Sequence, residues 1–223
     1  LSAVQSYYAR KEIRANLERN TELDLVIKAQ IIRYSLEAVE AALQNHIDDI
    51  ERSLPYPDSL VSVTRRIVEQ NPDFDGCCIA MIPDYYPEKG RLFQPCSYRD
   101  GKNIDTYLYD VKKYDYTKID YFNYAVNNDT AYWSEPYSDP DDPSATLVTY
   151  NFPVHQNDRV VGRVGVDLDA AWLGTVLNSH HQYPSSYDLL LSGNGKLICG
   201  PNAAEVKHQE VKDMVAMING STL

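Results

Sequence analysis

Aspartate and aromatic side chains lie close together in the stretch from Trp133 to Asp169, and this combination can bind a small cation. The stretch carries two acidic clusters, one within residues 139–142 and one at Asp167 and Asp169. Carboxylates pair with an ammonium group, and the faces of aromatic rings attract it electrostatically. The chain also has 18 tyrosines against 4 phenylalanines, and tyrosine suits half-wet pockets. These residue types predict recognition of a small positively charged molecule.

No residue pattern predicts catalysis, a metal site or a cofactor. The Gly-Asn-Gly-Lys segment at 193–196 lacks phosphate-loop spacing, and there is no Gly-x-Ser-x-Gly motif. The aspartates at 139, 141 and 142 lack the glycine and glutamate of a calcium loop, and His180 with His181 reads as a solvated helix end. No nucleophile is visibly paired with a base. An enzyme, such as a hydrolase using the aspartate cluster, is therefore the weakest alternative.

The acidic clusters flank a predicted antiparallel hairpin. Residues 145–154 alternate, with Val148, Tyr150 and Phe152 on one face and Thr149, Asn151 and Pro153 on the other. His-Gln-Asn-Asp at 155–158 is turn chemistry, and residues 159–169 form the second strand. A sheet with aromatic side chains on its face and carboxylates at its rim is the predicted binding surface.

Residues 1–54 are predicted to form one long helix, since no glycine or proline occurs there. A single apolar stripe, with steps of three and four, runs along it from Leu25 to Leu54. Unbroken, such a helix is roughly 80 Å long, so its first turns are free to pair with a second copy. The alternative is a break near Asn20 and Thr21, where the threonine could cap a new start.

The remaining segments indicate an α+β fold. We expect a helix at 59–70, capped by Asp58 or Ser59, followed by strands at 74–84 and 91–101. An irregular tyrosine-rich cover is expected at 103–133, with a short helix at 121–126. A connecting helix is expected after Asp169. A smaller unit begins at Ser185 with a strand, a Gly-Asn-Gly turn, a second strand and a helix at 203–218. Two strands rarely make a freestanding sheet, so more strands follow Leu223 or this unit leans on the long helix.

Composition narrows the partners and the compartment. The net charge of −11 argues against nucleic acid and anionic membrane surfaces. No run of about 20 apolar residues occurs, and the chain begins mid-pattern without methionine, as expected of a piece of a longer protein. Cys77 or Cys78 could form a disulfide with Cys96; buried free thiols are the alternative.

In combination, four features of the chain resemble the double Cache (PDC-type, PAS-like) sensor domains. They are the long helix, the Trp-Ser-Glu-Pro-Tyr-Ser-Asp segment at 133–139, the Thr-Tyr-Asn-Phe-Pro-Val strand and the Gly-Val-Asp-Leu-Asp strand end. This resemblance implies a signalling helix at 1–54, a membrane-distal ligand-binding lobe at 55–183 and an incomplete proximal lobe at 184–223, each lobe with a central antiparallel sheet. It also implies the periplasmic part of an inner-membrane receptor, a histidine kinase or else a chemoreceptor. Homodimerisation through the helix and membrane spans on either side of the chain are expected.

The resemblance also implies a pocket in the distal lobe. In the amino-acid-binding members of the family, an arginine holds the carboxylate of the ligand. The corresponding position in this chain is Ile119, whereas the residues that correspond to those on the amine side of the ligand are present. Lys118 or Arg99 would be poor substitutes for that arginine. We therefore expect a small ligand, such as an amine, and not a standard amino acid with an arginine-held carboxylate. The expected ligand-binding residues are Tyr114, Tyr116, Tyr121, Phe122, Trp133, Tyr137, Asp139, Tyr150 and Asp167.

A purely structural dimerisation module with a vestigial pocket is the alternative to a ligand sensor. In that alternative the long helix is the functional part, and Asp167 only closes the hairpin.

Overall fold

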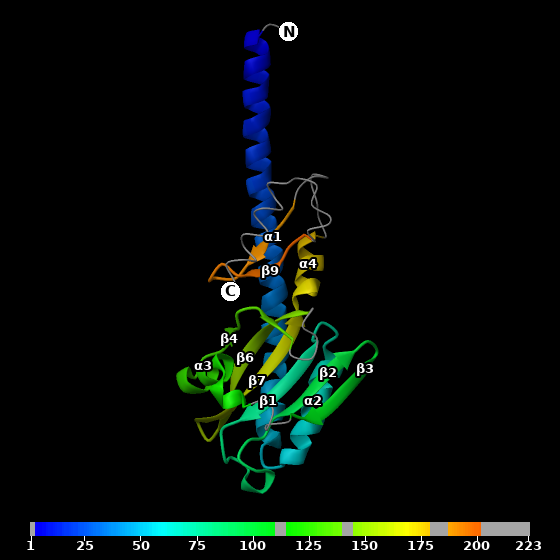
Figure 1. The fold of residues 1–223 in the computed structure, drawn as a ribbon, viewed down its shortest axis with the longest axis vertical. Helices are drawn as coiled ribbons and strands as arrows, with labels where there is room; N and C mark the ends of the chain where they lie inside the picture. The colour runs from blue at the N-terminus through cyan, green and yellow to red at the C-terminus, as the bar shows by residue number, and fades with distance from the viewer. Residues whose placement is uncertain (1–2, 110–114, 140–144, 179–186, 202–223) are drawn as a thin grey trace.

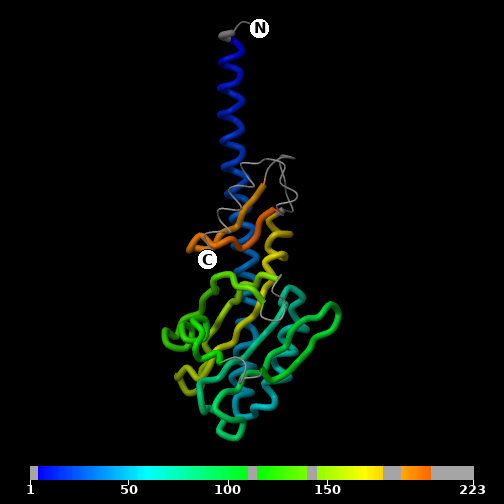
Figure 2. Tube along the Cα trace, in the orientation of Figure 1, coloured from blue at the N-terminus to red at the C-terminus, as the bar shows by residue number. Residues whose placement is uncertain are grey.

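The computed structural model describes residues 3–109, 115–139, 145–178 and 187–201. It confirms an α+β fold built along one long helix, α1 (Ala3–Ser53), whose N-terminal part extends beyond the rest of the chain (Figure 1). An antiparallel sheet packs against the C-terminal part of α1. A smaller two-stranded unit, β8 (Leu190–Leu191) and β9 (Leu197–Cys199), lies beside the middle of the helix (Figure 2).

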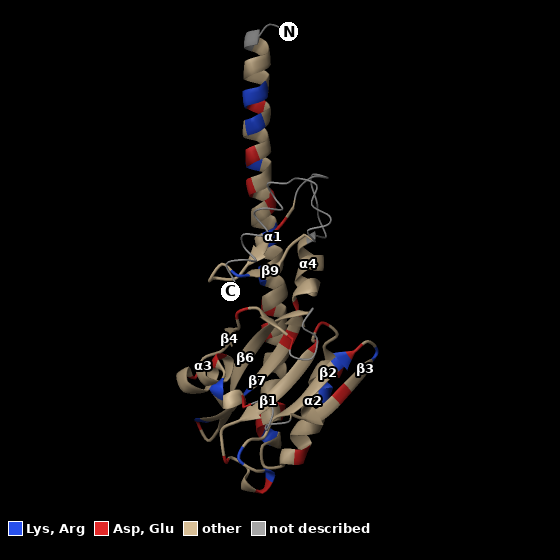
Figure 3. Cartoon of the chain, viewed as in Figure 1, with Lys and Arg blue, Asp and Glu red and all other residues tan. Residues whose placement is uncertain are grey.

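Helix α1 is unbroken, so the alternative break near Thr21 is wrong. The Thr21 hydroxyl instead donates to the carbonyl oxygen of Leu17 within the helix. From Ile32 to Leu54, where α1 covers the sheet, the predicted apolar stripe is buried except for Leu36, which is partly buried, whereas Leu25 stays exposed. Charged residues of both signs are distributed along the projecting part (Figure 3), and Arg14 forms an ion pair with Glu18. Among the described residues no helix is apolar over a length that would cross a bilayer.

Seven strands make up the main sheet, in the order β3-β2-β1-β7-β6-β4, and β5 also pairs with β6. All the pairings are antiparallel. The strands are β1 (Gly76–Met81), β2 (Pro95–Asp100), β3 (Asn103–Leu108), β4 (Tyr132–Trp133), β5 (Tyr137–Ser138), β6 (Thr146–Gln156) and β7 (Arg159–Asp169). The prediction missed β3 and β4, because both lie in the tyrosine-rich segment at 103–133 that was taken as an irregular cover.

The predicted hairpin is confirmed as β6 and β7 at the centre of the sheet. Asn157 and Asp158 form its tip, with φ values of 51° and 60°. Asparagine and aspartate tolerate this left-handed region, and two such residues in succession match the twist of a two-residue hairpin. The turn therefore fixes the register, in which Thr149 lies opposite Asp167 and Asn151 opposite Gly165.

The two faces of the sheet have different roles. One face carries apolar side chains, such as Ile79, Val164 and Tyr150, which form the main core with α1 and α2 (Pro57–Gln70). Helix α2 begins at Pro57 behind Tyr56, without the predicted side-chain cap from Asp58 or Ser59. The other face is covered at one end by η2 (Tyr116–Lys118) and α3 (Asp120–Asn128), which contains the predicted helix at 121–126.

A disulfide joins Cys78 of β1 to Cys96 of β2, which are directly opposite each other in register. This is one of the two pairings that the sequence allowed, and Cys77 is a buried free thiol on the opposite face. Disulfides persist in oxidising compartments, so the bond agrees with a location outside the cytosol.

The smaller unit is attached to α1 by a buried ion pair. Lys28 Nζ lies 2.6 Å from Asp188 Oδ2 and 2.7 Å from Asp24 Oδ2, and both Lys28 and Asp188 are buried. Helix α4 (Ala170–Asn178), the predicted connecting helix, leads from β7 toward this unit. The helix predicted at 203–218 lies outside the described residues, as does most of the segment that was expected to form a proximal lobe.

Candidate functional site

A cavity of about 280 Å³ lies over the sheet face opposite α1. Its floor comes from alternate residues of neighbouring strands, and its walls come from the β2–β3 hairpin, from Tyr121 of α3 and from the loop after β5. It is lined by Asp75, Cys78, Gln94, Tyr98, Arg99, Asp100, Asp105, Tyr107, Tyr109, Tyr121, Asp139, Leu147, Thr149, Arg163 and Asp167. This is a polar chamber with several aromatic walls.

Small residues occupy the centre of the floor, and larger neighbouring side chains lie over them. Gly76 and Cys78 lie on β1, and Gly165 lies opposite Cys78 on β7. A Cβ on Gly165 would lie only 1.9 Å from Nη1 of Arg163, and one on Gly76 would lie 2.5 Å from the Tyr98 ring. Glycine at these two positions lets an arginine and a tyrosine lie flat across the strands.

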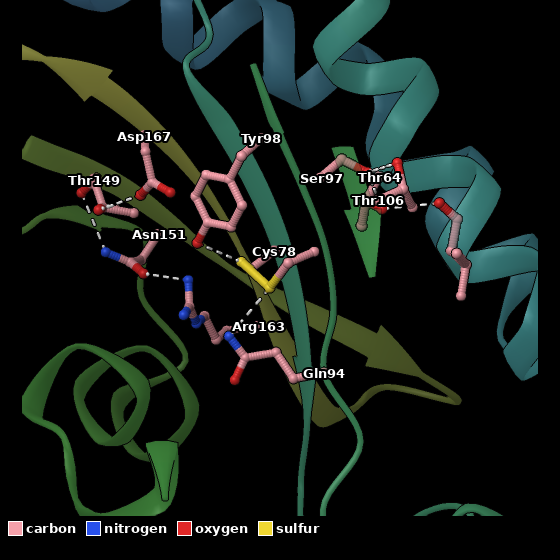
Figure 4. The surroundings of a disulfide bond; sticks show 12 residues. Thr64, Cys78, Gln94, Ser97, Tyr98, Thr106, Thr149, Asn151, Arg163 and Asp167 are labelled. Atoms are coloured by element: carbon pink, nitrogen blue, oxygen red, sulfur yellow. Dashed lines mark hydrogen bonds between the residues drawn. A yellow bond between two sulfur atoms is a disulfide. The ribbon is translucent and has the colours of Figure 1, made fainter. Parts of the chain in front are cut away.

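Asp167 is the buried carboxylate of the cavity, with 6% of its surface exposed. Its Oδ1 accepts hydrogen bonds from Thr149 Oγ1 at 2.6 Å and from the Tyr137 hydroxyl at 3.2 Å (Figure 4 shows the Thr149 contact). Burial raises the pKa of Asp167, while these hydrogen bonds and the charge of Arg163 oppose the rise. A desolvated carboxylate beside a cavity favours a cationic ligand, which restores the charge interactions lost from water.

Arg163 is a buried cation on the same strand, with 3% of its surface exposed. Its Nη1 donates to Asn151 Oδ1 at 3.0 Å, and its guanidinium carbon lies 4.5 Å from the centre of the Tyr121 ring. Within the described residues its Nε has no hydrogen-bond partner, and neither does Oε1 of Gln94, which also lines the cavity. Buried polar atoms are rarely left unpaired, so both atoms are candidates to contact a ligand.

The disulfide forms part of the same wall. Sγ of Cys78 lies 3.1 Å from the Tyr98 hydroxyl, and the amide nitrogen of Gln94 lies 3.5 Å from Sγ of Cys96 (Figure 4). The neighbouring residue Ser97 points the other way and contacts Thr64 of α2. Alternation along β2 thus places the disulfide and Tyr98 on the cavity side, where the crosslink keeps two strands of the floor in register.

Asp75 adds a second carboxyl whose pKa is displaced. Burial raises it to about 6 from a usual 3.8, and repulsion from Asp169, Asp167 and Asp139 adds to the effect. Between these two pKa values the folded protein holds a proton that the unfolded chain has released. Folding stability should therefore fall as the pH rises from about 4 to about 6.

This pH dependence is a testable expectation for the empty protein. Thermal unfolding at half-unit steps between pH 4 and pH 7 should show a declining melting temperature across that window, and Asp75→Asn should flatten the decline. An Asp73→Asn variant changes a nearby exposed carboxylate and serves as the control. A wild-type slope that Asp75→Asn leaves unaltered would assign the effect to other groups.

The structure brings together some of the predicted ligand-binding residues. Tyr121, Asp139 and Asp167 line the cavity. Tyr137 supports Asp167 through its hydroxyl group, and this hydroxyl also lies 2.7 Å from Thr149 Oγ1. These four residues retain a geometric basis for a role in binding.

Four others lie elsewhere. Tyr116 is fully buried beneath the covering helices, where its hydroxyl donates to the Met81 carbonyl oxygen at 2.7 Å, and Phe122 packs against its ring. Tyr150 points to the helix side of the sheet, because it alternates with the cavity-facing Thr149, and it packs against Trp133. All four are placed by core packing and do not line the cavity. Tyr114 lies outside the described residues.

Arg163 is the main residue that the sequence interpretation missed. The sequence interpretation looked for an arginine at position 119, but that position is Ile119, which lies between η2 and α3. Arg163, which lines the cavity, comes from β7 instead. The prediction therefore overlooked an arginine that lines the cavity. Alternation could have revealed it, since Arg163, Gly165 and Asp167 are two residues apart and so share one face of the strand. Asp75, Tyr98, Tyr107 and Tyr109 were also missed.

The arrangement is suited to holding a polar small molecule. Among the described residues no group of three or more histidine, cysteine, aspartate or glutamate side chains is placed to hold a metal ion. The chamber instead presents opposite charges on one strand, with tyrosine rings around them.

A family model covers the part of the chain that forms this cavity. Residues 60–175 match the family model for the methyl-accepting chemotaxis protein-like, first PDC sensor domain. No curated protein matches the chain. The matched segment begins in α2 and ends in α4, so it includes the main sheet and the whole cavity.

Solved structures share the fold over most of the chain. The extracellular domain of soHK1S-Z6, a protein assigned as a histidine kinase, is 25% identical with a TM-score of 0.71, over 95% of this chain and 83% of that one. The ligand-binding domain of the Campylobacter jejuni chemoreceptor Tlp3, in complex with L-norvaline, is 14% identical with a TM-score of 0.64, over 88% and 73%. That of the Pseudomonas aeruginosa PAO1 amino acid chemoreceptor PctB, in complex with L-Arg, is 19% identical with a TM-score of 0.61, over 86% and 74%.

Proposed function

This chain belongs to the family of methyl-accepting chemotaxis protein-like first PDC sensor domains, and from that membership we propose that it senses a small amine-bearing molecule held in the cavity over β1 and β7. The observation that carries the proposal is the buried Asp167 carboxylate, which faces a chamber of about 280 Å³. Burying a charged carboxylate away from water costs free energy, and a cationic ligand bound in the adjacent cavity would offset that cost.

We further propose that the domain is periplasmic and belongs to an inner-membrane receptor of a bacterium. The disulfide between Cys78 and Cys96 supports an oxidising compartment. The similarity to the extracellular domain of soHK1S-Z6 supports a histidine kinase as the parent protein. A chemoreceptor is the second candidate, because the matching family model describes chemotaxis-type sensor domains.

Dimerisation through α1 is part of the proposal. The projecting half of the helix carries exposed apolar residues at Ile13, Leu17 and Leu23, although it is otherwise strongly charged. Apolar side chains on a helix that extends beyond its own domain are readily covered by a parallel copy. This feature also suits the purely structural module, but that alternative gives no reason for charged residues to line the cavity.

A ligand screen tests the proposal. Thermal unfolding of the protein is followed with amines, amino acids, short carboxylates and sugars, and hits are measured by calorimetry and by sedimentation. We expect at least one amine-bearing compound to raise the melting temperature, because binding to the folded state alone is stabilising. A protein that dimerises but responds to no compound of any class would favour the structural module instead.

A further inference from the structure

We propose that the disulfide between Cys78 and Cys96 is a thiol-exchange site, which a small thiol reaches through the cavity and attacks at Sγ of Cys78. The first product carries the small thiol on Cys78 and a free thiolate on Cys96. This inference goes beyond the proposed function, because it requires no bound amine and concerns a covalent change in the wall of the cavity. Low-molecular-weight thiols are the class of molecule that the site takes.

The two sulfurs of the disulfide differ in their access to the cavity. Cys78 lines the cavity, whereas Cys96 does not line it and has no exposed surface. Tyr107 of the edge strand β3 also lines the cavity and has 36% of its surface exposed, so the cavity opens to solvent beside this strand. The rate of thiol exchange depends on access to the attacked sulfur. Cys78 is therefore the sulfur that a diffusible thiol attacks, and Cys96 is the leaving group.

Both sulfurs accept a hydrogen bond from a neighbouring side chain (Figure 4). The Tyr98 hydroxyl lies 3.1 Å from Sγ of Cys78, and it is the donor because a disulfide sulfur carries no hydrogen. The side-chain amide of Gln94 donates to Sγ of Cys96 at 3.5 Å. Hydrogen bonds to a thiolate stabilise its negative charge. The Gln94 amide is thus placed to stabilise the charge that Cys96 acquires when the disulfide opens.

Gln94 has little structural reason to be an amide at this position. It is buried, with 3% of its surface exposed, and its Oε1 has no hydrogen-bond partner within the described residues. An unmet buried acceptor costs free energy, and a leucine would fill a similar volume without that cost. The position therefore agrees with a role beside the sulfur, and a Gln94→Leu variant is expected to fold.

The charge of the cavity discriminates among thiols. Five aspartates and two arginines line it: Asp75, Asp100, Asp105, Asp139, Asp167, Arg99 and Arg163. A cleft lined by an excess of one charge concentrates molecules of the opposite charge and speeds their entry. An aminothiol is therefore expected to react faster than a thiol acid of the same size.

The exchange proceeds in two balanced steps. In the first, the thiolate of a small thiol attacks Sγ of Cys78, a new S–S bond forms, and the bond to Cys96 breaks with its electron pair left on Sγ of Cys96. In the second, another small thiolate attacks the sulfur of the bound thiol, which releases a small disulfide and leaves a thiolate on Cys78. The two cysteine thiolates take up the protons that the small thiols released. The protein disulfide thus gains two electrons, and two small thiols are oxidised to one disulfide.

Two single variants test which sulfur is accessible. Cystamine, the disulfide of the aminothiol cysteamine, is added to the full chain carrying Cys96→Ser or Cys78→Ser, and the modified peptides are identified by mass spectrometry. Attack of the remaining thiolate on cystamine is the reverse of the second step. We expect Cys78 in Cys96→Ser to be modified at least about 10-fold faster than Cys96 in Cys78→Ser. The two variants lack the same crosslink, so the comparison is matched for its loss.

Rates of reduction of the wild-type disulfide test the role of charge. Cysteamine, 2-mercaptoethanol and 3-mercaptopropionate are compared, and each rate is divided by the rate of the same thiol with a small soluble disulfide. On this scale we expect cysteamine to react about 10-fold faster than 3-mercaptopropionate. The difference should shrink in about 1 M sodium chloride, because salt screens the carboxylates.

Gln94→Leu tests the leaving group. We expect it to slow reduction by every thiol about 10-fold, because the charge on Cys96 loses its hydrogen bond. Gln156→Leu is the control, since it makes the same substitution near the hairpin tip, outside the cavity.

Cys77 provides an internal measure of unfolding. It is a free thiol with no exposed surface, on the opposite face of β1 from Cys78. Urea below the unfolding transition should accelerate maleimide labelling of Cys77 about 10-fold per molar, because labelling requires opening of the sheet, and should not accelerate reduction of the disulfide. Parallel acceleration of both reactions would show that reduction requires unfolding, and would overturn the thiol-exchange site.

The remaining outcomes are equally decisive. Equal modification of Cys78 and Cys96 in the single variants, equal normalised rates for the three thiols, or a wild-type rate in Gln94→Leu would each overturn the inference. None of these results affects the amine sensor, which the ligand screen tests separately. A domain that binds no amine could still exchange thiols, and a domain that senses an amine could have an inert disulfide.

Discussion

Asparagine in place of Asp167 is expected to abolish the response to an amine-bearing ligand while leaving the empty protein at least as stable as wild type. The amide oxygen can still accept the hydrogen bonds from Thr149 and Tyr137 that now reach Oδ1. The negative charge, whose burial raises the pKa of Asp167, is gone. Loss of one partner from a buried charged contact costs about 3 kcal/mol, which corresponds to roughly a 100-fold weaker affinity.

Two measurements check this expectation. Calorimetry on the best compound from the ligand screen gives the change in affinity, and thermal unfolding without ligand gives the change in stability. Asp169→Asn is a suitable control, because Asp169 lies on the same strand but accepts a hydrogen bond from the backbone of Ala171 outside the cavity. An Asp167→Asn protein that keeps its fold and its full ligand response would remove the amine site from the proposal.

Replacing both Cys78 and Cys96 by alanine is expected to lower the free energy of unfolding by about 3 kcal/mol, because the crosslink restrains a short segment of the unfolded chain. The two cysteines are 18 residues apart. For a domain of this size the loss corresponds to a fall in melting temperature of about 6–12 °C. Ligand affinity should fall too, since the disulfide and Tyr98 share one wall of the cavity.

Reductant provides the matched comparison for this prediction. Dithiothreitol should lower the melting temperature of wild type toward that of the double variant and should leave the double variant unchanged. Cys199→Ala removes a free, half-buried thiol and should not alter the response to reductant. Equal destabilisation of wild type and the double variant by reductant would mean that the crosslink is not the origin of the effect.

The elements that the sequence predicted well are those with a strong period. The stripe along α1 continues in steps of three and four to Leu54, and the alternation along β6 separates Thr149 from Tyr150 correctly. Each signal spans many residues, so local exceptions do not hide it. The edge strand β3 was missed because it is largely exposed and its asparagine, aspartate and single tyrosine suggest a loop as readily as a strand.

The site was predictable only in part, for a different physical reason. Asp167 could be placed, since it ends a clearly alternating strand. Tyr150 was chosen for its aromatic character, whereas the alternation along β6 places it on the face opposite the cavity-lining Thr149. Arg163 was missed because its value depends on neighbours that only the fold supplies: Gly165 beneath it, Tyr121 above it and Asn151 beside it. Likewise, cysteine spacing left two partners open for Cys96, and only the register of β1 and β2 decides between them.

Strand β6 separates the cavity on one face of the sheet from helix α1 on the other. Thr149 and Asn151 face the chamber, while on the reverse side Tyr150 meets Trp133, whose indole nitrogen donates to Glu40 of α1 at 2.7 Å. Further along, Glu51 of α1 accepts from the backbone nitrogen of His155. A molecule that binds in the cavity and shifts β6 must therefore disturb the contacts that this strand makes with α1 on the opposite face. Trp133 thus offers a built-in fluorescent reporter of occupancy at a distance from any bound molecule.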